Sequence, residues 1–97
     1  MTPEQRNILR INEPKLVSGI IPSDILSWIM CLTDEDNEVI MAEERNYGYS
    51  RAARLLLDRL KRRGAEAFGQ LVSALRRNGL EHLALLIDPN NEGIVEE

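Results

Sequence analysis

The apolar positions in the second half of the chain recur with the period of an α-helix. Two sets show this spacing: Ala53, Leu56, Leu57 and Leu60, and then Phe68, Leu71, Val72 and Leu75. At about 100° per residue, each set occupies a stripe roughly 100° wide, which is the width of a helix surface that faces a protein core. Nothing in this stretch alternates with the period of two that a β-strand would show. The pattern therefore predicts two amphipathic helices.

Basic residues followed by glycine indicate where these two helices end, at residues 61–64 (KRRG) and 76–79 (RRNG). Cations are favoured at the negative end of a helix, and glycine adopts the left-handed cap conformation without steric cost. A third, short helix is expected over residues 80–87, closed by Asp88 and Pro89. Because the links are short, neighbouring helices are expected to be antiparallel.

Start signals near the N-terminus predict a first helix. Thr2 is expected to cap it, with Pro3 at the first helical position and Gln5 completing a capping box. Pro14 lacks a backbone donor, and its ring clashes with the preceding turn. This helix is therefore expected to bend or break near Pro14 and to stop near Gly19.

Two further helices are predicted before the first long stripe. A start signal at residues 21–24 (IPSD) leads into a short helix over residues 25–31. Thr33 is expected to cap the next helix, whose acidic first turn suits the helix dipole and which fades by Glu44. A turn at residues 46–49 and a cap at Ser50 then begin the long helix. The count is six helices, which predicts an all-α, antiparallel bundle.

Composition narrows the class of protein. The chain has 97 residues, of which 43% are hydrophobic and 29% charged, as expected of one globular domain. We assign this domain to residues 1–89 and interpret residues 90–97 as an acidic, flexible tail or linker. The net charge of -4 argues against a general nucleic-acid binder. The single cysteine, the absence of a signal pattern and the absence of a long apolar run favour a cytoplasmic protein.

The sequence carries no pattern for catalysis or for a cofactor. One cysteine, Cys31, and one histidine, His82, cannot build a tetrahedral metal site, and no glycine-rich phosphate loop is present. Cys31 is interpreted as a small buried hydrophobic residue and Trp28 as a core residue. We therefore expect no enzyme activity, no cofactor and no metal.

Charges of opposite sign are separated along the chain. The acidic block is Asp34, Glu35, Asp36, Glu38, Glu43 and Glu44. The basic blocks are Arg6 and Arg10, and then Arg51, Arg54, Arg59, Lys61, Arg62, Arg63, Arg76 and Arg77. This segregation is more informative than the small net charge, because it predicts surfaces of opposite sign on one molecule.

Several stretches together resemble a caspase-recruitment domain (CARD) of the death-fold superfamily. They are residues 32–40 (LTDEDNEVI), 56–64, 67–68, 74–75, 79 and 83–86, with Pro14 where CARDs usually break their first helix. The resemblance covers residues 3–88. Two branches of the family share it: residues 63–64 and 67–68 are similar to initiator caspases and their adaptors, whereas residues 1–6, 21–27 and 42–46 are similar to antiviral RNA-helicase sensors.

The resemblance implies homotypic binding to another CARD or to itself, often in helical oligomers, in apoptosis or innate immunity. Its commonest contact pairs a basic face of the first and fourth helices with an acidic face of the second and third. The candidates for the basic face are Arg6, Arg10, Arg51 and Arg54. Those for the acidic face are Asp24, Asp34, Glu35, Asp36 and Glu38. Secondary candidates are Leu55, Arg62 and Arg63.

Simpler readings of the same residues stay open. First-turn acids stabilise a helix start without any partner, and Leu55 can be covered by a neighbouring helix. A nucleic-acid-binding role through the basic cluster between Arg59 and Arg77 is the alternative function. The aromatic fraction of 4% disfavours it, because single strands are usually bound by base stacking.

Overall fold

The computed structural model describes residues 1–89 of the chain. The expected tail at residues 90–97 lies outside this part. Within it, no strand is present and the helices follow one another as α1 (Pro3–Ile11), α2 (Glu13–Gly19), α3 (Pro22–Ile25), the 3-10 helix η1 (Leu26–Trp28), α4 (Asp34–Tyr47), α5 (Tyr49–Lys61), α6 (Glu66–Arg77) and α7 (Glu81–Ile87). When α1 with α2 and α3 with η1 are each taken as one interrupted helix, these are the six predicted helices.

The first helix begins and breaks for the predicted reasons. The Thr2 hydroxyl accepts from the Gln5 backbone N–H, and the Gln5 side chain accepts from the Thr2 N–H, so the capping box is present. The helix ends at Ile11, before Pro14, and Asn12 closes it through its backbone N–H and its side chain, both bonded to the Ile8 carbonyl. Pro14 then lies in the first turn of α2, where a missing donor costs nothing.

Three predicted boundaries are wrong by a few residues. The helix expected over residues 25–31 is instead α3 followed by η1 and ends at Trp28. Helix α4 continues to Tyr47, so the turn between α4 and α5 is a single residue, Gly48. Its φ of 97° lies in the region that glycine adopts without strain, which lets the chain reverse in one step. Because α5 already begins at Tyr49, Ser50 is not its cap.

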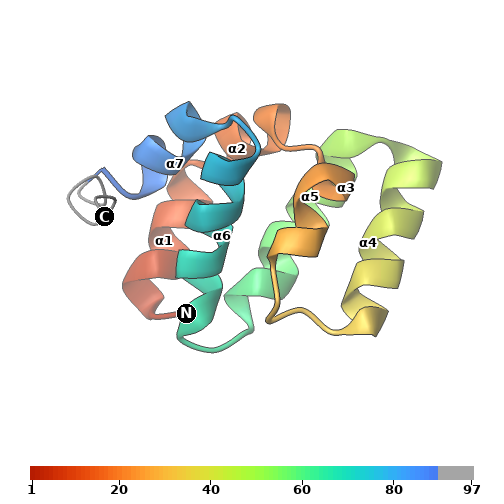
Figure 1. Ribbon diagram of the computed structural model, residues 1–97, viewed down its shortest axis with the longest axis horizontal. Coiled ribbons are helices and arrows are strands. Elements are labelled where there is room, and N and C mark those ends of the chain that lie inside the picture. The colour runs from red at the N-terminus through yellow and green to blue at the C-terminus, as the bar shows by residue number, and fades with distance from the viewer. Residues whose placement is uncertain (90–97) are drawn as a thin grey trace.

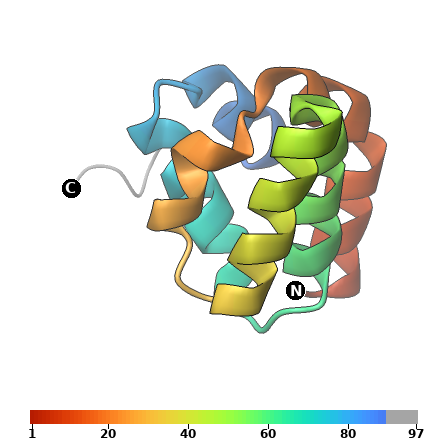
Figure 2. The same ribbon diagram turned by 90° about the vertical axis from the view of Figure 1, so that its right-hand side faces the viewer.

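Helix α5 lies at the centre of the core. It contacts α2, α3, α4 and α6, and Figures 1 and 2 show it between α1 and α4. The predicted stripe is confirmed, since its inward residues are fully buried: Ala52, Ala53, Leu56, Leu57 and Leu60. The α6 stripe is buried as well. Each fully buried leucine contributes about 1.5–3 kcal/mol, so α5 anchors the fold.

Asp36 has a structural role that the sequence did not reveal. It was expected on an exposed acidic face, but only 1% of the residue is exposed, so this expectation is wrong. The reason is a cluster of partners. One carboxylate oxygen lies 2.8 Å from Arg59 Nη1, the other is paired with Arg63, and the Thr33 backbone N–H also donates to it. The start of α4 is thereby tied to the end of α5.

The environment keeps this buried carboxylate charged. Burial alone would raise the pKa of Asp36, but hydrogen bonds from Thr33 and Arg59, together with the charge of Arg63, outweigh it and lower the pKa. The lowered value means that the ionised form stabilises the folded state.

Trp28 and Cys31 differ from their predicted places in the core. Trp28 is 44% exposed, because the tight turn of η1 directs Leu26 and Ile29 inward instead. The Arg77 guanidinium lies 5.0 Å from its ring centre, a cation–π contact. Cys31 is half-buried against the core, and burial raises the pKa of its thiol, which keeps it neutral. Among residues 1–89, no helix is long and apolar enough to cross a membrane.

Replacing Asp36→Asn is expected to lower the free energy of unfolding by about 3 kcal/mol, because it leaves two arginines without their anion. Urea denaturation of both proteins measures the difference. The folded pKa lies below the ordinary value of about 3.9, so the stabilisation is complete above that pH and is lost as the pH falls through the folded pKa. A loss of stability that is equally large at pH 2 and pH 7 would contradict this assignment.

Candidate functional site

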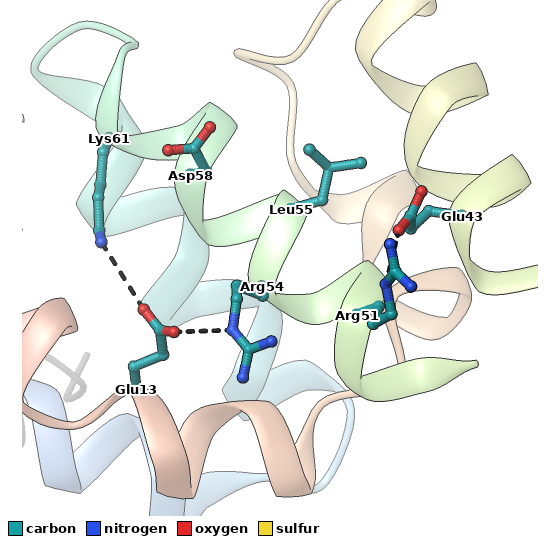
Figure 3. A pocket seen from close by; sticks show the side chains of 7 residues that line it. All are labelled: Glu13, Glu43, Arg51, Arg54, Leu55, Asp58 and Lys61. Carbon is teal, nitrogen blue, oxygen red and sulfur yellow. Dashed lines mark hydrogen bonds and ion pairs between the residues drawn. The ribbon is translucent and has the colours of Figure 1, made fainter. Parts of the chain in front are cut away.

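An open groove runs along the outer side of α5. It is lined by Glu13, Glu43, Arg51, Arg54, Leu55, Asp58 and Lys61 (Figure 3). Five of these residues come from successive turns of α5, which the buried apolar stripe forces to face outward. Glu13 and Glu43 come from the flanking helices α2 and α4. Charged side chains therefore surround one half-buried leucine, Leu55.

All three cations of the groove already have a partner within the chain. Arg54 Nε lies 3.0 Å from a Glu13 oxygen, Lys61 Nζ lies 4.0 Å from the other, and Arg51 Nε lies 3.2 Å from Glu43 (Figure 3). The Arg51 and Arg54 side chains are nevertheless 58% and 60% exposed. Pairs this exposed contribute only about 0–1 kcal/mol each, so an incoming anion could displace them at little cost.

The arginines of α1 extend this surface. Arg6, Arg10 and Lys61 line a second shallow groove with Pro3 and Asn7. Arg6 donates to the Lys61 carbonyl oxygen at 3.2 Å, and Arg10 donates to the Asn7 side chain at 2.6 Å. Neither arginine forms an ion pair within residues 1–89. Because Lys61 lines both grooves, the four predicted arginines lie on one continuous surface with it. We call Arg6, Arg10, Arg51, Arg54 and Lys61 the basic face.

Four of the predicted acids are exposed on α3 and α4. Asp24 lies on α3, and Asp34, Glu35 and Glu38 lie on the first turns of α4. We call these four residues the acidic face. Helix α4 stands at the opposite end of the bundle from α1 (Figure 1). The acidic and basic faces thus lie on different helices, although α4 packs against α5, and the buried Asp36 belongs to neither face.

The secondary candidates divide into two groups. Leu55 is half-buried in the groove, and Arg62 is exposed beside Asp58 at 3.3 Å. Arg63 is held by Asp36 and is less available for a partner. The structure also adds groove residues that were not among the predicted site residues: Glu13, Glu43, Asp58 and Lys61. Glu13 and Glu43 could not have been found from spacing, since only the packing of three helices brings them to α5.

Comparison with known proteins supports an interaction role. The model of the caspase recruitment domain family matches residues 1–91. The chain belongs to the CARD family. Neither the comparison with curated proteins nor that with solved structures found a match. CARDs are homotypic interaction modules of apoptosis and innate-immunity signalling that bind other CARD-containing proteins, and the helical bundle is consistent with their death fold.

The described residues of this CARD do not gather into a metal site. Within residues 1–89, no three residues of the types His, Cys, Asp and Glu are grouped so that they could hold an ion. His82 is exposed on α7, and the neutral thiol of Cys31 is a poor nucleophile.

Replacing Glu13→Gln is expected to change the free energy of unfolding by about 1 kcal/mol or less, because Glu13 pairs with the exposed Arg54 and only at 4.0 Å with Lys61. The variant is a matched control for Asp36→Asn, since each removes one carboxylate shared by two cations. Urea denaturation compares the two. If both variants lose the same stability, burial is not what distinguishes the two clusters.

Proposed function

We propose that this CARD recruits another CARD-containing protein, or further copies of itself, by placing its basic face against an acidic face of the partner. The observation that carries the proposal is the continuous surface formed by Arg6, Arg10, Arg51, Arg54 and Lys61 along α1 and α5. The acidic face on α3 and α4 supplies the complementary surface on the same molecule. Charge complementarity of this kind speeds association and selects partners more than it adds affinity.

The internal ion pairs support a role of these charges in recognition rather than in stability. The exposed pairs of Arg51 and Arg54 contribute little to folding, whereas removing the buried Asp36 carboxylate would leave two arginines without their anion and destabilise the fold. Arg6 and Arg10 have no anionic partner within residues 1–89, so a bound acidic surface would supply one.

The alternative nucleic-acid-binding function finds less support. Of the basic cluster between Arg59 and Arg77, two members, Arg59 and Arg63, are held by Asp36. Arg76 lies 3.7 Å from Glu81, and Arg77 covers Trp28. Three of the six cations of this cluster, Arg59, Arg63 and Arg76, therefore already have an acidic partner at the end of α5 or beside α7.

We propose that residues 1–89 form a non-catalytic interaction module. We further propose that it acts in the cytoplasm, in apoptotic or innate-immune signalling. Both branches of the family, the one of initiator caspases and the one of antiviral sensors, fit the proposed contact.

Reversing charge at Arg51→Glu and Arg54→Glu together is expected to weaken self-association or partner binding by more than about tenfold, since attraction becomes repulsion. Analytical ultracentrifugation and pull-down with a partner CARD measure the loss. The far-ultraviolet circular dichroism spectrum should be unchanged.

Lys15→Glu, a reversal at an exposed residue of α2 that lines neither basic groove, is the matched control and should bind normally. Association that survives the double reversal at Arg51 and Arg54 would refute the assignment of the basic face.

A further inference from the structure

A tyrosine lies on either side of Gly48, at the corner where α4 passes into α5. Tyr47 is the last residue of α4 and Tyr49 is the first residue of α5. The two residues are 59% and 55% exposed, and every residue from 45 to 51 is exposed as well. Aromatic rings usually stabilise a protein by being buried, so the fold itself does not account for this pair.

The two tyrosines differ in their surroundings. The guanidinium of Arg51 lies 4.2 Å from the centre of the Tyr47 ring, and its Nε lies 3.2 Å from a Glu43 oxygen (Figure 3). Tyr49 and Arg51 are two positions apart on α5, so they do not face each other. Within residues 1–89, therefore, only Tyr47 of the two is in contact with a cation of the basic face.

We propose that Tyr47 is a phosphorylation site and that its phosphate captures Arg51, which lowers the affinity of the basic face for an acidic partner. The inference rests on the proposed function and adds a means of regulating it.

The transfer would be made by a protein tyrosine kinase from Mg²⁺-bound ATP. The phenolic oxygen of Tyr47 forms the new bond to the γ-phosphorus, and the bond from that phosphorus to the β–γ bridging oxygen breaks. ADP leaves, and the phenolic proton passes to a base of the kinase. Hydrolysis by a tyrosine phosphatase would release inorganic phosphate and restore the phenol, so the change is reversible.

The charges around Tyr47 support the capture of Arg51. A tyrosine phosphate carries about −1.5 to −2 charges at pH 7 and has three acceptor oxygens, whereas Glu43 carries a single charge. Arginine binds phosphate through two parallel hydrogen bonds, and its exposed pair with Glu43 is weak. The phosphate is therefore expected to replace Glu43 as the partner of Arg51. It would also place negative charge at one end of the basic face, where it repels an acidic surface.

The corner can also be opened for a kinase that reads an extended segment. The last turn of α4 is closed by the backbone N–H of Gly48, which donates to the Glu44 carbonyl at 3.0 Å. The buried stripe of α5 begins only at Ala52. Opening residues 45–49 thus breaks bonds at a helix end but moves no residue that is itself buried. Such openings are among the least costly in a folded protein.

The experiment compares two chains that each carry one phosphotyrosine. Tyr49→Phe and Tyr47→Phe are treated with a purified tyrosine kinase and Mg²⁺-bound ATP, and mass spectrometry locates the phosphate. Phosphate at Tyr47 is expected to weaken self-association or partner binding by about tenfold or more. Phosphate at Tyr49, the matched control, should change it by less than about threefold at physiological salt, where exposed charges are screened. Analytical ultracentrifugation and pull-down with a partner CARD measure both.

Phosphorus-31 NMR tests the capture of Arg51 without any partner. A nearby cation favours the dianionic phosphate, so the second pKa of the phosphate on Tyr47 is expected to lie below that of the phosphate on Tyr49. Arg51→Gln should raise the pKa at Tyr47 and leave the pKa at Tyr49 unchanged. Glu43 is present in every chain compared, so its effect on the phosphate does not account for the difference.

Several outcomes would overturn the inference. One is a folded chain that accepts no phosphate at Tyr47 from a kinase that modifies a peptide of residues 42–52. Another is a loss of association in unmodified Tyr47→Phe, which would make Tyr47 a contact residue rather than a switch. A pKa at Tyr47 that ignores Arg51→Gln would show that the phosphate does not capture Arg51.

The double reversal at Arg51 and Arg54 separates this inference from the proposed function. If that reversal abolishes association but phosphate at Tyr47 does not weaken it, the regulation is wrong and the basic face stands. If the double reversal has no effect, the proposed function fails, and the regulation of the basic face fails with it.

Discussion

The packing of α5 against its neighbours is the constraint on which the rest of the structure depends. Its inward stripe is completely buried and contacts α2, α3, α4 and α6. A helix held in this way cannot rotate about its axis without exposing leucines. Its charged side is therefore fixed toward solvent, and the groove between Glu13 and Glu43 follows from the core rather than from the charges that line it.

The two carboxylates that each pair with two cations in this CARD differ in how deeply they are buried. Asp36 and Glu13 each hold two cations, but the Asp36 side chain is 2% exposed and the Glu13 side chain 27%. The first carboxylate joins two helices and is charged because its partners compensate for lost hydration. The second lies where water reaches it, and its partner Arg54 stays accessible to another molecule. Helix α5 thus carries arginines of two kinds: Arg59 is held by the buried Asp36, whereas Arg54 is exposed beside Glu13.

The sequence predicted the fold well where local rules and tertiary packing agree. The apolar stripes of α5 and α6, the caps at Thr2 and Thr33, and the break before Pro14 were all correct. The sequence did not predict side-chain burial correctly where tertiary contacts determine it. Trp28 looked like a core residue by type, but the 3-10 turn exposes it. Asp36 looked like a first-turn surface acid, but two arginines 23 and 27 positions away bury it.

The one-residue connection at Gly48 has a mechanical consequence. A longer loop would let α4 and α5 hinge more freely, whereas here one glycine joins the two helices at one end and the Asp36 pairs with Arg59 and Arg63 join them at the other. In any assembly that used both helices, the rotation from one subunit to the next would depend on the angle between α4 and α5. The pitch of that assembly would then be set by packing inside each subunit, far from the residues at the contact between subunits.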